Sequence, residues 1–257
     1  MTKSLPPLPE LLTHTHLLTE RQRRQGSIGP VGPLLCVHSE AERDGQPVAV
    51  DRFFAGDCSP QAALLAMRNF GTEKDHLLFV VDAPAERQRA FLRAGFRLVE
   101  SQWMMTCNLA ERQPTGSELA TGVTVLRATD GGDALALSAI DGLEAVQIDE
   151  LRDPALMHYY VTANNRPATY GRSAHYDSGI AWVSHVHTAP QYRRRGYAAA
   201  LMERILADSV QAGVAQSMLL ATSLAHSLYA RLGYTDLADV AILYAPPALL
   251  RRKTRTS

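Results

Sequence analysis

A short basic loop lies between an apolar segment and an amphipathic one, and this arrangement suits the binding of phosphate groups. Residues 180–188 are rich in β-branched and aromatic side chains, which predicts a strand. After Gly196 the spacing of the apolar residues changes to that of a helix. A helix N-terminus carries unpaired N–H groups and a partial positive charge, so residues 193–198 form a candidate pyrophosphate site.

Residues 193–198 read Arg-Arg-Arg-Gly-Tyr-Ala. The helix dipole alone contributes about 0.3–1 kcal/mol to the binding of an anion, so N–H groups and arginine side chains must supply the rest. Gly196 lets a phosphate approach the backbone closely, and Ala198 is too small to block it. The alternative is a solvated basic start to an ordinary helix, and the motif alone does not decide between the two.

The chain after this helix repeats the order of strand and helix. Residues 217–222 predict a second buried strand, and residues 225–232 predict a short helix that ends at Gly233. An extended stretch follows from Tyr234 to about Tyr244. The phosphate-binding candidate therefore belongs to a larger α/β arrangement.

Two blocks of this region resemble the GNAT superfamily of N-acetyltransferases. They are Val186-x-Thr-x-Pro-x-Tyr-Arg-Arg-Arg-Gly-Tyr-Ala198 and Ala225-x-x-Leu-Tyr-x-x-x-Gly-Tyr234. The resemblance implies an α/β (α+β) fold with a mixed, mostly antiparallel sheet flanked by helices. It also implies an N-acetyltransferase that transfers an acetyl or other acyl group from acetyl-CoA to an amine by direct attack. A non-catalytic acyl-CoA sensor is the alternative.

The resemblance also implies roles for particular residues. Tyr229 matches the family tyrosine that protonates the departing CoA thiolate, a contribution typically worth roughly 10²–10⁴ in rate. A core aromatic side chain is the alternative for Tyr229. The residues expected to bind acetyl-CoA are Val186, His187, Thr188, Arg193, Arg194, Arg195, Gly196, Tyr197 and Ala198.

The general base is the unassigned part of this interpretation. Family members often carry it four or six residues before the position of Thr188, where this chain has Ser184 and Trp182. His185 and His187 have a suitable ordinary pKa of about 6.5. Strand alternation places both on the face opposite Ser184 unless a bulge intervenes. Carboxylates that remain as candidates are Asp141, Glu144 and Glu150.

The N-terminal half of the chain resembles the C-terminal half. Residues 77–107 repeat the order of residues 218–245, with strand, helix, glycine and strand at matching places. Phe91 stands where the second copy has Tyr229, and Asp57, which would repel a pyrophosphate, precedes the helix where the basic loop should be. Coincidence between two strand–helix–strand units is the alternative.

The predicted fold therefore has two similar halves. Residues 1–112 are expected to form a degenerate GNAT-like domain without an acyl-CoA loop. Residues 113–122, polar and containing Pro114, are expected to form a linker. Residues 123–257 are the expected acetyltransferase domain, with helices near 133–144 and 151–157 and a hairpin across Asn164-Asn165.

Composition excludes several other classes of protein. The formal net charge is zero, so nothing indicates a nucleic-acid partner. No Cys/His cluster has zinc spacing, so no metal is expected. No run approaches the roughly 18 apolar residues that cross a bilayer, and the three unpaired cysteines indicate a cytoplasmic protein. The expected partner is a small-molecule amine or amino acid, and a homodimer is compatible with the sequence.

Overall fold

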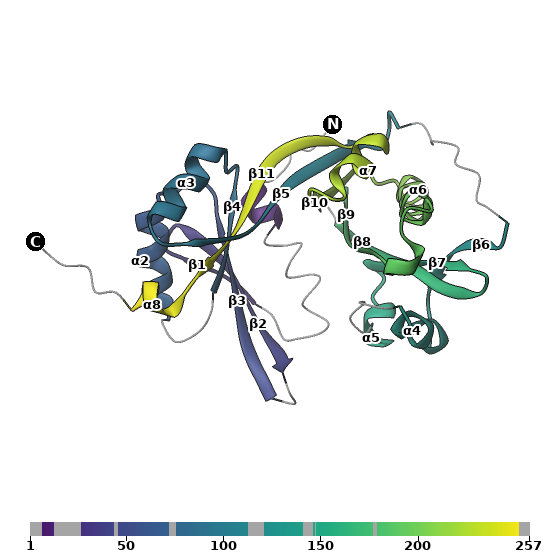
Figure 1. Ribbon diagram of the computed structural model, residues 1–257, viewed down its shortest axis with the longest axis horizontal. Helices are drawn as coiled ribbons and strands as arrows, with labels where there is room; N and C mark the ends of the chain where they lie inside the picture. The colour runs from purple at the N-terminus through teal and green to yellow at the C-terminus, as the bar shows by residue number, and fades with distance from the viewer. Residues whose placement is uncertain are drawn as a thin grey trace, which may run out of the picture. The chain divides into compact units, whose positions relative to one another are not determined.

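The computed structural model contains two compact units, whose helices and strands are labelled in Figure 1. Unit 1 consists of residues 1–104 and 237–257, and unit 2 consists of residues 105–236. The structure describes residues 7–12, 27–43, 46–71, 76–112, 121–140, 146, 148–176 and 179–251.

Both units contain helices and strands. The elements that lie wholly or mainly in unit 1 are β1 (Ser27–Val31), β2 (Leu34–Arg43), β3 (Gln46–Ala55), α2 (Pro60–Phe70), β4 (His76–Val81), α3 (Ala85–Arg93), β5 (Arg97–Asn108), β11 (Thr235–Ala245) and α8 (Pro247–Leu250). Those of unit 2 are β6 (Val123–Ala128), α4 (Gly131–Ser138), α5 (Ile148–Leu151), β7 (Leu156–Ala163), β8 (Arg166–Tyr176), β9 (Ile180–Thr188), the 3₁₀-helix η1 (Pro190–Tyr192), α6 (Tyr197–Gln211), β10 (Gln216–Ala221) and α7 (His226–Arg231).

Unit 1 is built on a mixed sheet with the strand order β1-β2-β3-β4-β11-β5. Strand β2 pairs antiparallel with β1 and β3, and β4 pairs antiparallel with β11. The one parallel pair described in this unit is β3 with β4, and α2 connects these two strands. A core of apolar side chains from α2, α3, α8 and the strands holds the unit together.

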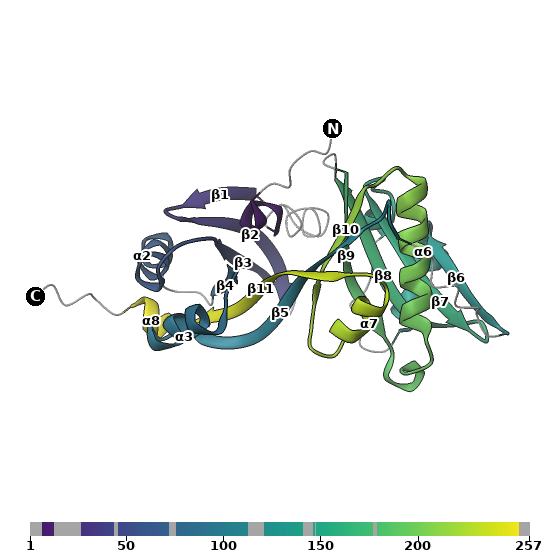
Figure 2. The ribbon, with the colours of Figure 1, turned by 90° about the horizontal axis from the view of Figure 1, so that it is seen from above.

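Unit 2 has the strand order β5-β10-β9-β8-β7-β6, and its described pairs are antiparallel from β6 through β9. Strands β9 and β10 are parallel, and α6 connects them, as α2 connects β3 and β4. Helix α6 packs on β7, β8 and β9 (Figure 2), while α4 and α5 lie on the other face of these strands (Figure 1). The predicted α/β fold with a mostly antiparallel sheet flanked by helices is confirmed.

The boundaries of the two units differ from the linker that the sequence predicts at residues 113–122. Strand β11, near the end of the chain, pairs with β4 in unit 1, from Ala245 opposite His76 to Val240 opposite Val81. Unit 2 begins at residue 105, inside β5, and β5 neighbours β10. Each unit therefore contains a strand segment from the other half of the sequence. Residues 113–120 lie outside the described residues.

Local sequence explains the hairpin of unit 2. Asn164 and Asn165 have φ angles of 50° and 61°, which asparagine tolerates better than most residues. They connect β7 to β8, so the predicted hairpin is confirmed. The helix predicted near residues 151–157 is wrong, because α5 ends at Leu151 and β7 begins at Leu156. Pro154 disfavours helical backbone in the residue before it, so Pro154 explains the early end of α5.

The helices in the described part of the chain are too short or too polar to span a lipid bilayer.

Candidate active site

Strand β9 contains a bulge at His185, within the segment that sequence analysis assigned to acyl-CoA binding. Ser184 lies opposite Arg172 of β8 and His187 lies opposite Tyr170, so β9 advances one residue more than β8 over this interval. His185 has a φ of 56°, a left-handed backbone conformation that is uncommon for residues other than glycine. The extra residue interrupts the alternation of side chains along β9.

The bulge brings His185 to the same face of the sheet as Ser184. Arg172 Nε donates a hydrogen bond of 3.1 Å to Ser184 Oγ, and Arg172 Nη2 lies 3.4 Å from His185 Nε2. Arg172 also faces Glu150 of α5, so this is the face covered by α4 and α5. The sequence places His185 on the face opposite Ser184 unless a bulge intervenes, and the structure contains this bulge.

The pairing of β9 with β10 stops before the bulge. The parallel ladder runs from Gln216 opposite Ile180 to Leu219 opposite Val183, and β9 continues through Thr188 beyond it. In the described ladder, the backbone groups of the last β9 residues face no β10 partner. A strand edge of this kind can hydrogen-bond an extended ligand in place of a neighbouring strand.

The backbone of the basic loop, residues 193–196, makes the N-terminus of α6 suitable for binding an anion. Arg194 and Gly196 have φ angles of 64° and 82°, and alternating backbone of this kind turns successive N–H groups toward one point. Gly196 is the N-cap residue, and no side chain caps the helix. A Cβ atom built on Gly196 would meet nothing within 4 Å, so the space beside Gly196 is open.

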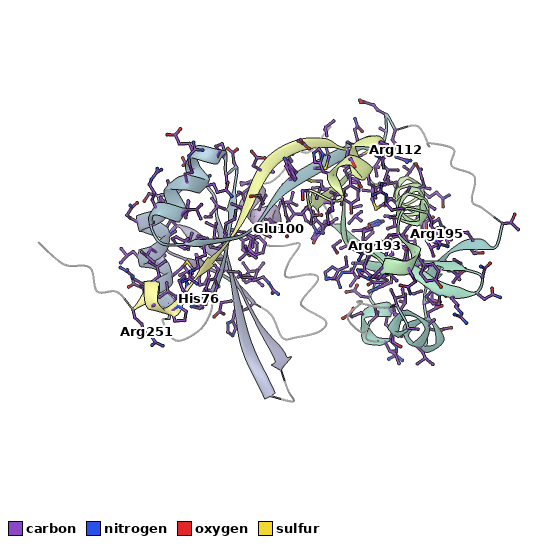
Figure 3. All side chains as sticks on the ribbon, in the orientation of Figure 1. His76, Glu100, Arg112, Arg193, Arg195 and Arg251 are labelled. Carbon is purple, nitrogen blue, oxygen red and sulfur yellow. The ribbon has the colours of Figure 1, made fainter. Side chains whose placement is uncertain are left out.

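The arginine side chains hold the loop and surround it with positive charge. Arg193 Nε donates a hydrogen bond of 3.0 Å to the carbonyl oxygen of Thr188. The guanidinium carbon of Arg195 lies 5.9 Å from the ring centroid of Tyr192, a cation–π contact. Arg193 and Arg195 are labelled in Figure 3. Uncapped N–H donors, open space and three exposed arginines together fit the pyrophosphate of a coenzyme A.

Tyr229 lies on the short helix α7 and is 6% exposed. Burial raises the pKa of its hydroxyl to about 12, so the hydroxyl keeps its proton at neutral pH. Its ring contacts that of Tyr234 edge to face, with centroids 5.9 Å apart. The Tyr234 hydroxyl lies 2.6 Å from Ser217 Oγ, whereas no hydrogen bond of the Tyr229 hydroxyl is found within the described residues.

Of the three carboxylates that the sequence offers as candidate bases, the structure describes only Glu150. Glu150 is completely buried, and its Oε2 lies 3.8 Å from Arg172 Nη1. A carboxylate enclosed with a guanidinium is poorly placed to meet an incoming amine. Asp141 and Glu144 lie outside the described residues.

Sequence reasoning missed a buried polar cluster beneath the bulge. His158 Nδ1 lies 2.7 Å from the Tyr170 hydroxyl, and both side chains are almost fully buried, as is Arg172. The Tyr160 hydroxyl donates a hydrogen bond of 2.7 Å to Asp133 Oδ1 on α4. The sequence carried one signal of this cluster. Polar side chains two residues apart occur in each strand of the hairpin, and such side chains point to the same face of a sheet. Within the described residues, no group of three or more His, Cys, Asp and Glu side chains could hold a metal ion.

Unit 2 thus combines a parallel strand pair that separates beside a bulge with a basic loop and a helix whose N-terminus has no side-chain cap. Residues 177–236 match the family model of the acetyltransferase (GNAT) domain. Within unit 2, residues 177–236 are therefore similar to an acetyltransferase (GNAT) domain, in the region where the motifs predict this resemblance. No curated protein is significantly similar to it in sequence.

Solved structures with the same fold cover nearly the whole chain. A GCN5-related N-acetyltransferase from Kribbella flavida has a TM-score of 0.67 at 17% identity, covering 94% of this chain and 97% of that chain. A GCN5-related N-acetyltransferase from Sphaerobacter thermophilus has a TM-score of 0.58 at 16% identity, covering 82% and 76%. A tandem GNAT protein from the clavulanic acid biosynthesis pathway has a TM-score of 0.54 at 13% identity, covering 85% of each chain. At these identities the likeness establishes the fold.

Two glycines that flank α6 allow a controlled test of whether the basic loop binds acetyl-CoA. Gly196 precedes α6 and Gly213 follows it, with φ angles of 82° and 75° and open space around both. Alanine at either position costs about 1–2 kcal/mol of backbone strain. Gly196→Ala is expected to weaken acetyl-CoA binding about tenfold or more in a calorimetric titration, which corresponds to about 1.4 kcal/mol. Gly213→Ala is expected to lose similar thermal stability with unchanged affinity, and equal affinity losses in both variants would contradict the assignment of the loop.

Proposed function

We propose that unit 2 transfers an acetyl or other acyl group from acyl-CoA to the amine of a small molecule or amino acid. The observation that carries this proposal is the bulge in β9 beside the end of its ladder with β10. It leaves strand backbone available next to a helix N-terminus that suits a pyrophosphate. Acetyl-CoA supplies the acyl group as a thioester.

The donor would be held mostly by backbone groups. The N–H groups of residues 194–198 are suited to the pyrophosphate, since φ at Arg194 and Gly196 turns them together. Backbone groups of Val186, His187 and Thr188 would pair with the pantetheine arm, and an N–H there would stabilise the oxyanion that forms on the acyl carbonyl.

Tyr229 is the proposed general acid. Cleavage of the thioester leaves a thiolate whose thiol has an ordinary pKa of about 8.5. A buried hydroxyl with a pKa of about 12 stays protonated and can donate to this thiolate. The hydroxyl has no hydrogen-bond partner among the described residues that would compete for this role.

His185 is the proposed acceptor of the amine's proton, directly or through a water molecule. A lysine-like amine is almost fully protonated at pH 7, and removing its proton costs about 4 kcal/mol. His185 is exposed and lies on the face of Ser184, where family members often carry the base. Arg172 Nη2 can only donate to His185 Nε2, so this contact of 3.4 Å would have to open when that nitrogen takes the proton.

His185→Gln is expected to lower kcat/KM by roughly 10² or more, because an amide cannot take up the proton of the amine. His175 provides the matched control, because it lies on the α6 face and its Nε2 is 3.2 Å from Ser209 Oγ. His175→Gln is expected to keep the wild-type kcat/KM. Retention of the wild-type kcat/KM in His185→Gln would exclude His185 as the base.

Unit 1 is proposed to be a degenerate copy without an acyl-CoA site. Its parallel ladder extends to Ala55, the last residue of β3, and the register of β2 with β3 contains no bulge. Ser59 caps α2 by accepting a hydrogen bond from the Ala62 N–H, and Pro60 has no N–H to offer. The Arg87 guanidinium donates to the carbonyls of Gly56, Val81 and Asp82 and so connects the chain after β3 with the end of β4.

A panel of amines tested with acetyl-CoA, with release of free thiol as the readout, tests the proposed function. Thiol release that depends on one class of amine would support it. Binding of acetyl-CoA without thiol release from any amine would instead support the alternative of a non-catalytic acyl-CoA sensor. Trp182 and Ser184, which replace the usual bases, are the observation that favours this alternative.

A further inference from the structure

Unit 2 has a pocket of about 460 Å³ that the proposed acyl transfer does not use. The residues that line it come from the end of β5, the start of β10, the end of α7 and the start of β11. They are Thr106, Asn108, Glu111, Arg112, Gln216, Arg231, Leu232, Gly233 and Thr235. A pocket of this volume is in the range of small-molecule sites.

The pocket lies far from the acyl-CoA loop. Gln216 is opposite Ile180, the first residue of β9, whereas the loop follows Thr188 at the other end of that strand. At the usual rise along a strand, these two ends are roughly 25 Å apart. A ligand in the pocket is therefore distinct from the pyrophosphate proposed at α6.

Buried hydrogen-bonding groups without partners line the pocket. The Arg112 side chain is only 6% exposed (Figure 3), and its Nη2 pairs with Glu203 on α6. Among the described residues, its Nε has no hydrogen-bond partner, and neither has Thr106 Oγ1. A buried donor without a partner costs about 1–3 kcal/mol, so such groups usually meet a water molecule or a ligand.

The other polar groups of the pocket are mostly donors. Asn108 Oδ1 already accepts a hydrogen bond of 3.1 Å from the Ala110 N–H, which leaves its NH₂ group available. Arg231 is exposed and forms no ion pair among the described residues, so its guanidinium charge is uncompensated there. Glu111 is the one carboxylate in the lining, and solvent screens its charge and that of Arg231 alike, whereas the donor at Arg112 Nε is buried.

An excess of donors together with an uncompensated guanidinium suits a ligand rich in acceptors. We infer that this pocket binds a small oxyanion, a carboxylate or a phosphate, between Arg112 Nε and the Arg231 guanidinium. Arginine is well suited to both groups, because its planar N–H donors match their oxygen atoms. Arg231 follows Tyr229 by two residues on α7, so an occupant of this pocket would contact the helix that carries the proposed acid.

The test is a calorimetric titration of the full chain with inorganic phosphate and with succinate, at constant ionic strength. Wild-type protein is expected to bind at least one of them with a Kd of about 1 mM or tighter. Arg231→Gln is expected to weaken this binding at least about tenfold, and Arg231→Lys less, because lysine keeps the charge. Arg166→Gln, at another exposed arginine of unit 2, is the control and should bind as the wild type does.

Two outcomes would overturn the inference. One is that neither anion binds the wild-type protein at about 10 mM. The other is that binding persists unchanged in Arg231→Gln, which would locate the anion elsewhere, for instance at the acyl-CoA loop. Neither outcome bears on acyl transfer, since Arg231 has no part in the proposed donor site.

Discussion

Tyr229→Phe is expected to lower kcat by roughly 10²–10⁴ while leaving the KM for acetyl-CoA nearly unchanged. The substitution removes only the hydroxyl, and the ring keeps its contact with Tyr234. The departing thiolate then has no protein acid, but the groups that hold the pyrophosphate remain. Steady-state kinetics with a responsive amine would measure both constants.

Tyr234→Phe is the matched control for this experiment. The Tyr234 hydroxyl is buried and hydrogen-bonded to Ser217 Oγ. Its loss is expected to lower the free energy of unfolding by about 1–3 kcal/mol and to leave kcat nearly unchanged. Burial raises the pKa of Tyr229 to about 12, so its neutral, proton-donating form persists as pH rises from 7 to about 10. A Tyr229→Phe variant with full turnover would refute the role of general acid.

Residues 123–257 expressed alone are expected not to form a stable, active domain. This fragment lacks residues 105–112, which belong to unit 2 and include Arg112, the partner of Glu203 on α6. Strand β10 would lose its neighbour β5, and β11 would lose β4. Unpaired strand edges expose backbone hydrogen-bonding groups and promote aggregation.

Circular dichroism, thermal unfolding and gel filtration would measure the outcome. Co-expression with residues 1–112 is expected to restore a folded protein and acyl transfer, because this second fragment supplies the missing strands. Cooperative unfolding and wild-type turnover by residues 123–257 alone would contradict this account, in which each unit needs a strand segment from the other half of the sequence.

The sequence predicted the elements that are determined by the residues within them. Strand β9 has the predicted limits, Ile180 and Thr188, because its β-branched and aromatic residues are continuous. The turn at Asn164-Asn165 was predictable because few other residues accept positive φ. The start of α6 was predictable from Gly196 and the change of apolar period that follows it.

The features that the sequence did not predict depend on packing between segments that are far apart in the chain. Nothing in the sequence near His185 indicates a positive φ, which arises where β9 passes Gly171 of β8. A Cβ on Gly171 would lie 2.7 Å from Leu201 Cδ2, so the close approach of α6 also requires this glycine. The placement of β11 beside β4 was not predictable for a different reason, since the two strands are more than 150 residues apart in the sequence.

Binding of acetyl-CoA to the full chain, measured by calorimetry, tests the central claim most directly. One site per chain is predicted, with a Kd roughly between 1 µM and 1 mM, the range in which enzymes commonly bind their substrates. Free coenzyme A should compete for this site, and Gly196→Ala should weaken it while Gly213→Ala does not. Absence of binding at saturating acetyl-CoA by a correctly folded protein would contradict the account.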